Sequence, residues 1–209
     1  MSSMKNYVIT IARGYGSGGK KIGQLLGKQL GIPCYEEEII KMASDKSGIA
    51  ESIFQNADEK NQLGKWKRFV YKWALGMEDD TKGISGRELF EAQKEVIQEL
   101  ARTQSCIIVG KCADHVLRYF NNVVSVYIEA PRVECLRRLR EKYGWSDEEA
   151  AERIMKMDHQ RAAYYRVYAG GEWTDPMNYD LTLNSMTLGE EGCAKLITEC
   201  LKYKVLEER

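Results

Sequence analysis

The sequence has no surplus of charge of either sign and very little histidine. Lysine plus arginine and aspartate plus glutamate each number 31 in 209 residues. A general nucleic-acid binder carries a surplus of basic residues to hold the phosphate backbone, so we expect no nucleic-acid partner. A local basic cleft for a small anion is still compatible with this balance. The two histidines, His115 and His159, are too far apart for a local metal motif.

Long apolar runs and paired cysteines are also missing. No stretch approaches the roughly 20 apolar residues of a membrane-spanning helix, and residues 1–5 are too few and too polar for a signal peptide. We therefore expect a cytoplasmic protein with no membrane partner. None of the six cysteines belongs to a C-x-x-C pair, which favours buried, reduced thiols over disulfides or a zinc site.

What the sequence does contain is a series of short apolar segments separated by helical patterns, without hairpin signals or internal repeats. This alternation predicts an α/β fold, a five-stranded parallel sheet with helices on both faces. The length suits one domain with an inserted subdomain. In such a sheet ligands bind beyond the carboxyl ends of the strands. The predicted strands are 7–12, 33–35, 106–110, 123–128 and 179–184.

The strongest functional signal lies between the first strand and the first helix. Four glycines occur within six residues there, and Gly14, Gly19 and Lys20 fit the pattern G-x-x-x-x-G-K. Glycines let backbone amides turn toward an anion, and a helix N-terminus adds partial positive charge. A plain connecting turn is the alternative, but it does not need four glycines. We expect Lys20 to be a catalytic contact to the β- and γ-phosphates of ATP, within a binding loop formed by Gly14, Tyr15, Gly16, Ser17, Gly18, Gly19, Lys20 and Lys21.

Lys21 departs from this pattern, because its position normally holds a serine or threonine hydroxyl that binds Mg²⁺. A lysine cannot ligate a cation. We therefore expect Lys21 to point away from the metal, or to pair with phosphate or a carboxylate. Magnesium would then be held mainly by the nucleotide phosphates and by water, with Asp114 as a candidate contact through water. No residue is assigned as a direct metal ligand.

Two long helical regions are added to the alternating pattern. Residues 36–104 are helical in pattern throughout, and a connection of this length indicates an inserted subdomain rather than a simple crossover. Later in the chain, residues 146–149 form a capping box that starts another long helix. On that helix Arg153 and Arg161 share a face, and we expect both to be catalytic and to close on the transferring phosphate. The other basic residues of residues 132–166 are interpreted as solvated helix faces paired with glutamates. They are Arg132, Arg137, Arg138, Arg140, Lys142, Lys156 and Arg166, with Glu134, Glu141, Glu149 and Glu152 as partners.

A second candidate site follows the third predicted strand. Lys111 would hold the phosphate of an acceptor, and Asp114 would orient that lysine or the water around a metal. An ordinary strand-to-helix turn is the alternative. Asp158 lies beside Arg161 on the later helix and is a further candidate for substrate binding.

Weaker candidates for the acceptor are Glu37, Arg87 and Gln93. Glu37 belongs to a run of three glutamates, 36–38, one of which would hold a base or sugar, although acidic residues at a helix start also match the helix dipole. Four aromatic residues could stack on a base, but core packing is the stronger interpretation of Tyr164, Tyr165, Tyr168 and Trp173.

The order of these motifs resembles that of the cytidylate kinase-like proteins, over nearly the whole chain. The motifs are Ile9–Ile11, Arg13–Gly23, Gly31–Tyr35, Cys106–Asp114, Asp158–Tyr165, Tyr168, Trp173 and Asn178–Leu181. The resemblance implies a P-loop nucleoside monophosphate kinase fold. Its parts would be a core of residues 5–35, 105–144 and 169–209, a helical acceptor-binding insertion of residues 36–104, and a lid of residues 145–168.

The function that follows is ATP-dependent phosphoryl transfer, with magnesium, to a small acceptor. The resemblance implies a nucleoside monophosphate such as CMP or dCMP. The chain also departs from the true cytidylate kinases, since residues 109–112 read Val-Gly-Lys-Cys where those enzymes carry Asp-Gly-Arg-Asp. Two alternatives stay open: a kinase of a non-nucleotide small molecule, and a nucleotide-binding regulatory protein with little turnover, which Lys21 favours. The oligomeric state is left open.

Overall fold

Residues 6–57 and 85–206 are described here, from a computed structural model of the chain. Five parallel strands form one sheet in the order β2-β3-β1-β4-β5. The strands are β1 (Val8–Arg13), β2 (Cys34–Tyr35), β3 (Cys106–Val109), β4 (Val123–Glu129) and β5 (Leu181–Asn184). The predicted parallel sheet is therefore confirmed, with boundaries that differ by one or two residues.

The central strand β1 explains why the sequence begins with an unbroken apolar run. All six of its residues are buried, because β3 and β4 pair with its two edges and helices cover both faces. Strands of parallel sheets are typically buried in this way. The carboxyl ends of β1, β3 and β4 lie at one edge of the sheet, so the segments that follow them meet there.

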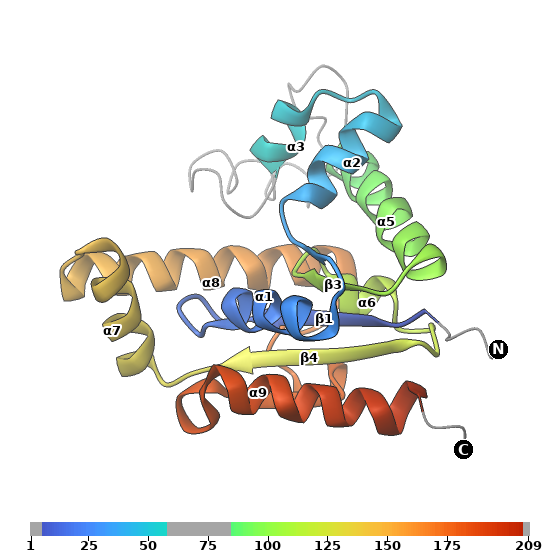
Figure 1. The fold of residues 1–209 in the computed structure, drawn as a ribbon. Helices are drawn as coiled ribbons and strands as arrows, with labels where there is room; N and C mark the ends of the chain where they lie inside the picture. The colour runs from blue at the N-terminus through green and yellow to red at the C-terminus, as the bar shows by residue number, and fades with distance from the viewer. Residues whose placement is uncertain (1–5, 58–84, 207–209) are drawn as a thin grey trace.

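Each face of the sheet has its own layer of helices (Figure 1). On one face α1 (Gly19–Leu30) and α9 (Ser185–Leu201) bury Ile22, Leu26 and Ile197 against the strands. On the other face lie α5 (Gly86–Thr103), α6 (Ala113–Val116) and α8 (Asp147–Ala169). Among the described residues, no helix has the length and apolar character needed to cross a membrane.

The described part of the inserted region consists of helices joined by short non-helical segments. The described helices are α2 (Glu38–Ser47), α3 (Glu51–Ala57) and α5, and they stand together above the sheet (Figure 1). Helix α5 starts with a capping box between Ser85 and Glu88, and its apolar face joins the core. The predicted aromatic helix around Trp66 and the predicted break beginning at Gly83 lie outside the described residues.

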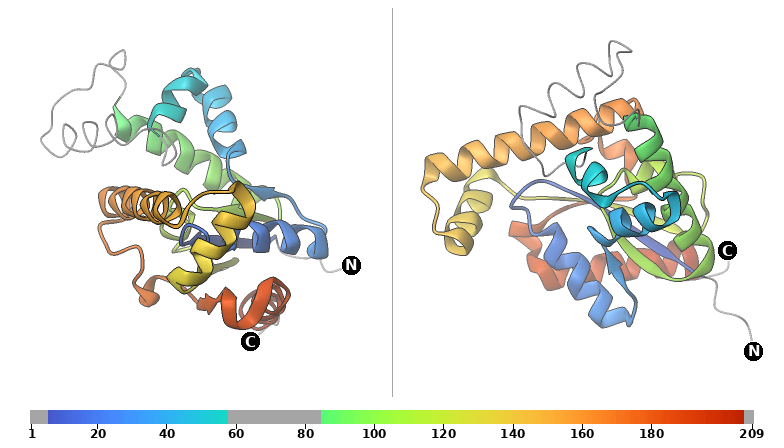
Figure 2. Two further views of the ribbon diagram at one scale, coloured as in Figure 1. Left: turned by 90° about the vertical axis from the view of Figure 1, so that its left-hand side faces the viewer. Right: turned by 90° about the horizontal axis from the view of Figure 1, so that it is seen from above.

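Helices α7 (Arg132–Tyr143) and α8 follow one another at the ligand edge and meet at a steep angle (Figure 2). The predicted capping box of Ser146 and Glu149 is confirmed at the start of α8. Helix α8 then runs without interruption for 23 residues, and its second half enters the core through Tyr164 and Tyr165. The residues predicted as a lid, 145–168, comprise the turn before α8 and almost the whole of this helix, which ends at Ala169.

The end of the chain returns to the other face of the sheet. A short 3₁₀ turn, η1 (Pro176–Asn178), precedes β5, and α9 follows β5 directly, with a non-helical residue at Gly189. A π-helical turn, η2 (Lys202–Leu206), ends the described part. All six cysteines are free thiols, and Cys106, Cys112, Cys135 and Cys193 are buried, as the absence of C-x-x-C pairs predicts.

Candidate phosphate-binding site

The segment between β1 and α1 is folded as an open loop around the start of the helix. Gly16 and Gly18 have left-handed backbone φ angles of 83° and 87°, which glycine adopts without strain. Gly18 caps α1 without a side-chain hydrogen bond, and the first turn of α1 carries no acidic residue. The amides at the start of this helix are therefore not matched by a side-chain acceptor of a described residue, an arrangement that suits a bound anion.

Close packing explains why the loop needs so many glycines. A Cβ atom on Gly19 would lie 2.5 Å from the Cβ of Arg13, and one on Gly16 would lie 2.9 Å from the Cβ of Cys135. One on Gly18 would lie 3.0 Å from Nη1 of Arg138. Side chains at these positions would push β1 and α7 away from the loop. The loop is therefore held as a tight cradle, which fits a polyphosphate.

Lys20 is held beside the loop by two glutamates that follow β2. Its ammonium group contacts the Glu36 carboxylate and lies 3.9 Å from Oε1 of Glu37. The hydrogen bond that Lys20 donates to Glu36 is the main reason that the pKa of Lys20 lies above its ordinary value. Glu36 also accepts a hydrogen bond of 3.0 Å from Nη2 of Arg13, in a buried ion pair.

Sequence reasoning chose Glu37 from this run, whereas the structure places Glu36 closer to the loop. Glu36 is buried and touches both Lys20 and Arg13, while Glu37 is exposed. A usable signal was present, since Glu36 is the first residue after β2 and so lies at the ligand edge of the sheet.

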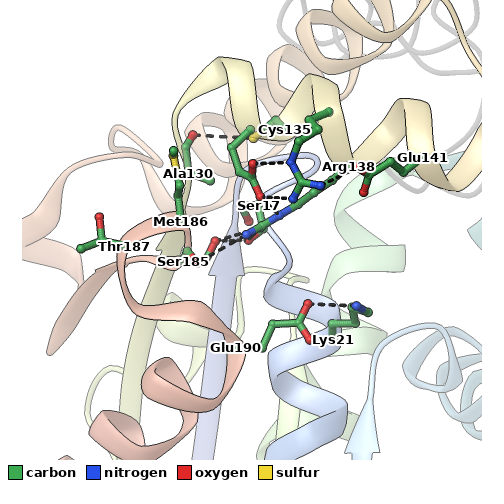
Figure 3. Close-up of polar contacts among 12 residues, drawn as sticks. Ser17, Lys21, Ala130, Cys135, Arg138, Glu141, Ser185, Met186, Thr187 and Glu190 are labelled. Atoms are coloured by element: carbon green, nitrogen blue, oxygen red, sulfur yellow. Dashed lines mark hydrogen bonds and ion pairs between the residues drawn. The ribbon is translucent and has the colours of Figure 1, made fainter.

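Two basic residues connect the loop region to other helices (Figure 3). Lys21 forms an ion pair of 3.0 Å with Glu190 of α9, which is one of the arrangements predicted for it. Arg138 of α7 donates a hydrogen bond of 2.8 Å to the Ser17 carbonyl. The prediction that Arg138 belongs to a solvated helix face is wrong, because its guanidinium group reaches the loop. For its neighbours Arg137 and Arg140 the predicted pairing with acidic residues is found.

Helix α8 contributes two of the predicted residues to the loop. Asp158 accepts a hydrogen bond of 2.7 Å from the Tyr15 amide, and burial is the main cause that raises the pKa of this carboxyl group. Arg161 is buried and donates a hydrogen bond of 2.9 Å to the Arg13 carbonyl. The guanidinium carbon of Arg161 lies 5.6 Å from the centre of the Tyr15 ring.

Arg153 is placed differently from Arg161. It is exposed, and its guanidinium carbon lies 6.0 Å from the centre of the Trp145 ring, at the turn between α7 and α8. Eight helical residues correspond to a separation of about 12 Å along α8. The shared face predicted for the two arginines therefore does not place them at the same point of the site.

The second predicted site, that of Lys111 and Asp114, is largely buried in the core. Lys111 and Asp114 are both buried, and Lys111 has a left-handed φ of 60°. Asp114 accepts a hydrogen bond of 2.7 Å from the hydroxyl group of Tyr165. Burial raises the pKa of Asp114 to about 6. Its side chain also lines a cavity of about 330 Å³ that reaches Ser125, near the amino end of β4.

The candidates on the inserted region are less closely tied to the loop. Arg87 is exposed in the first turn of α5. Gln93 is buried, and its amide nitrogen donates to the Leu89 carbonyl of the same helix at 3.3 Å. Phe90 stacks on Tyr168 with ring centres 4.2 Å apart, so the predicted packing of the aromatic group is confirmed.

Among the described residues there is no cluster of three or more metal-ligating side chains.

Comparisons with known proteins agree with this architecture. The sequence model of the cytidylate kinase-like family matches residues 8–187. An uncharacterized protein from Eubacterium ventriosum ATCC 27560 is 21% identical with a TM-score of 0.70, and the match covers 94% of this chain and 99% of that chain. Shikimate kinase from Acinetobacter baumannii in complex with shikimate is 14% identical with a TM-score of 0.51, covering 98% and 97%. At these identities the likeness concerns the fold, which is that of a P-loop kinase, as predicted. No curated protein gave a match.

Proposed function

Because the chain belongs to the cytidylate kinase-like family, we propose that it transfers the γ-phosphoryl group of ATP to a nucleoside monophosphate such as CMP or dCMP. The observation that carries the proposal is the loop of residues 14–20, where glycines in left-handed conformation, the start of α1 and Lys20 come together. Phosphoryl transfer depends mainly on positioning and on stabilisation of charge. Both are functions that such a loop can supply.

On the donor side, the loop amides and Lys20 hold the phosphates of ATP. Glu36 keeps Lys20 beside the loop. When ATP binds, the Lys20 ammonium group therefore exchanges the Glu36 carboxylate for a phosphate without moving far. Its raised pKa keeps the ammonium group charged at neutral pH. ATP brings magnesium, an ion that prefers oxygen ligands and keeps several waters.

The residues around the loop fit such an ion only in part. Lys21 occupies the usual hydroxyl position and is paired with Glu190. Asp114 is engaged by Tyr165. Glu36 contacts Lys20 and supplies a carboxylate at the phosphate end of the loop. Glu36 is also paired with Arg13. We therefore propose that magnesium is held mainly by the nucleotide phosphates and by water, with no direct ligand assigned among the described residues.

Arg161 and Asp158 also lie against the donor loop and are suited to contact the transferring group as it passes to the acceptor. Arg161 offsets the negative charge that spreads over the transferring phosphoryl group. A phosphate acceptor is already ionised near neutral pH, so the reaction needs no strong general base. Lys111, Arg87, Gln93 and Glu37 are proposed as further acceptor contacts, and Arg153 as a residue that approaches only when substrate is bound.

A non-nucleotide acceptor is the second candidate, and one observation favours it. Lys111, the cation proposed for an acceptor phosphate, is only 4% exposed. An acceptor without a phosphate group would not need an accessible cation at this position. The donor site and its chemistry would stay the same.

A screen of acceptors by coupled ADP release tests the proposal. The unaltered protein is assayed with ATP, magnesium and single acceptors, which include CMP, dCMP, the other nucleoside monophosphates and a set of small hydroxyl compounds. We expect ADP release that depends on CMP or dCMP and that disappears in Lys20→Ala. Release only with a hydroxyl compound would replace the nucleotide acceptor. ATP binding without release for any acceptor would indicate a regulatory nucleotide-binding protein.

A further inference from the structure

We infer that Arg138 is a positioning residue for the phosphate loop: together with Ser185 it holds the Ser17 carbonyl outward and so turns the Gly18 amide toward the donor phosphates. The inference rests on the proposed function in one respect, namely that the loop receives the phosphates of a nucleotide. It assigns a role to a residue whose sequence context indicated only a solvated helix face.

Three separate elements meet at the Ser17 carbonyl (Figure 3). Nη1 of Arg138, from α7, donates to this oxygen at 2.8 Å and also to the Ser185 hydroxyl oxygen at 3.0 Å. The Ser185 hydroxyl group, from the first residue of α9, donates to the same carbonyl oxygen. The carbonyl therefore receives two hydrogen bonds from outside the loop, and α7, α9 and the loop form one connected unit.

The orientation of one peptide group links these contacts to phosphate binding. In a planar trans peptide the C=O and N–H bonds point in opposite directions. With the Ser17 oxygen directed to Arg138 and Ser185, the Gly18 N–H points away from them, toward the concave side of the loop. Successive amides directed inward form an anion-binding nest. If this peptide turned over, a carbonyl oxygen would face the phosphates in place of an N–H.

The backbone at Gly18 has a conformation that glycine adopts more readily than other residues. Its φ of 87° and ψ of 0° belong to the left-handed region. The guanidinium group lies so close that even a Cβ atom on Gly18 would be 3.0 Å from Nη1 of Arg138. A side chain at residue 18 would therefore be strained by its backbone conformation and would press against the guanidinium group of Arg138.

Arg138 is itself held in place by Glu134. Nε of Arg138 donates to Oε1 of this glutamate at 2.7 Å, one turn earlier on α7. The pKa of Glu134 is lowered to about 2, mainly by its hydrogen bond from Arg137, so the carboxylate stays charged at all ordinary pH values. Because this charge offsets that of Arg138, the guanidinium group acts mainly by orienting its hydrogen bonds.

Arg137 provides a matched control. It is adjacent to Arg138 on α7 and bonds to the same Glu134, at 2.7 Å from Nη2. Its remaining contact is with Glu141 on the surface, and its side chain is 54% exposed. An alanine at residue 137 therefore removes the same charge from the same helix and leaves both hydrogen bonds to the Ser17 carbonyl in place.

Calorimetric titration with tripolyphosphate and, separately, with adenosine tests the inference. The protein is compared with R138A, R138K, S185A and R137A, and a thermal melt establishes that each variant is folded. R138A should weaken tripolyphosphate binding about tenfold or more, the effect expected for a lost hydrogen bond from a charged group. Adenosine binding should be unchanged. R138K should recover part of the loss, S185A should show a smaller loss, and R137A should bind as the unaltered protein does.

Three outcomes of the variant titrations would overturn the inference. The first is normal tripolyphosphate binding by R138A. The second is a loss of affinity in R137A as large as that in R138A, which would indicate a general charge effect. The third is an S185A variant that binds tripolyphosphate with unchanged affinity while R138A binds it more weakly. Arg138 would then act as a direct phosphate ligand and not through the Ser17 carbonyl. The titration needs no acceptor, so a failed acceptor screen leaves its result valid. A failure of the unaltered protein to bind tripolyphosphate would overturn both this inference and the placement of ATP.

Discussion

The donor side and the acceptor side of this protein are built in different ways. On the donor side, the loop of residues 14–20 is a continuous segment, and α7, α8 and α9 each contact it, through Arg138, Asp158 and Ser185. On the acceptor side, Lys111 and Asp114 are buried, and Arg87 and Gln93 come from a distant helix. A site on one segment can be recognised from its spacing, whereas a site assembled from several helices depends on their packing.

The largest expected effect tests whether Arg161 acts on the donor side. Arg161→Ala should lower kcat by about 10³-fold or more, as the loss of an arginine at a transferring phosphoryl group does. Steady-state ADP release with the acceptor found in the screen measures it. Arg166→Ala is the control, because Arg166 lies on the same helix but pairs with Glu172 at the surface. A normal kcat in the Arg161 variant would show that this arginine serves only to hold α8 against β1.

The buried pair of Arg13 and Glu36 is expected to matter for stability as well as for Lys20. Glu36→Gln should reduce the free energy of unfolding by about 3 kcal/mol, because it leaves a buried guanidinium group without its counter-charge. Urea denaturation measures the change. Glu37→Gln is the matched control, and as an exposed substitution it should change stability by less than about 0.5 kcal/mol. Equal effects of the two variants would remove the distinction made here between the two glutamates.

On the acceptor side, Asp114 should make stability depend on pH. Its pKa rises from 3.8 to about 6 on burial, so the folded protein binds this proton more tightly than the unfolded chain. The cost of ionising it is therefore absent below about pH 4, grows as pH rises and is complete above about pH 6, where it reaches on the order of 3 kcal/mol.

Asp114→Asn, which keeps an acceptor for Tyr165, should remove this cost. The variant should be more stable than the unaltered protein at pH 7 and of similar stability at pH 4, as measured by urea denaturation across that range. A difference between the two proteins that is the same at every pH would contradict the assignment, and would indicate that Asp114 is either ionised or neutral throughout.

The smallest expected effect concerns Lys21, where the loop departs from its own pattern. Lys21→Ser removes an exposed ion pair with Glu190, which contributes little to stability. Calorimetric titration of magnesium into the ATP complex should show tighter or unchanged binding. A tenfold weaker affinity for magnesium, about 1.4 kcal/mol, would mean that Lys21 does not occupy the hydroxyl position of the loop and that the assumed loop register is wrong.

The predictable parts of the site are those whose residues lie close together in the sequence. The glycine loop, the capping box at Ser146 and the end of α1 at Gly31 each depend on neighbours within a few residues. Arg138 was not predictable in the same way, because its partners, Ser17 and Ser185, are 121 and 47 residues away in the chain. On the sequence alone it could not be told from Arg137, which shares its charge, its helix and its glutamate.

The sequence by itself determined the parallel α/β fold, the phosphate loop and the order of the motifs, because these follow from the spacing of apolar residues, glycines and caps along one segment at a time. Only the tertiary structure decided which charged side chains serve the loop. It moved Glu36, Arg138 and Asp158 to the loop and drew Asp114 into the core. The physical reason is that a charge acts through distance and burial, and both are fixed only when the helices pack on the sheet.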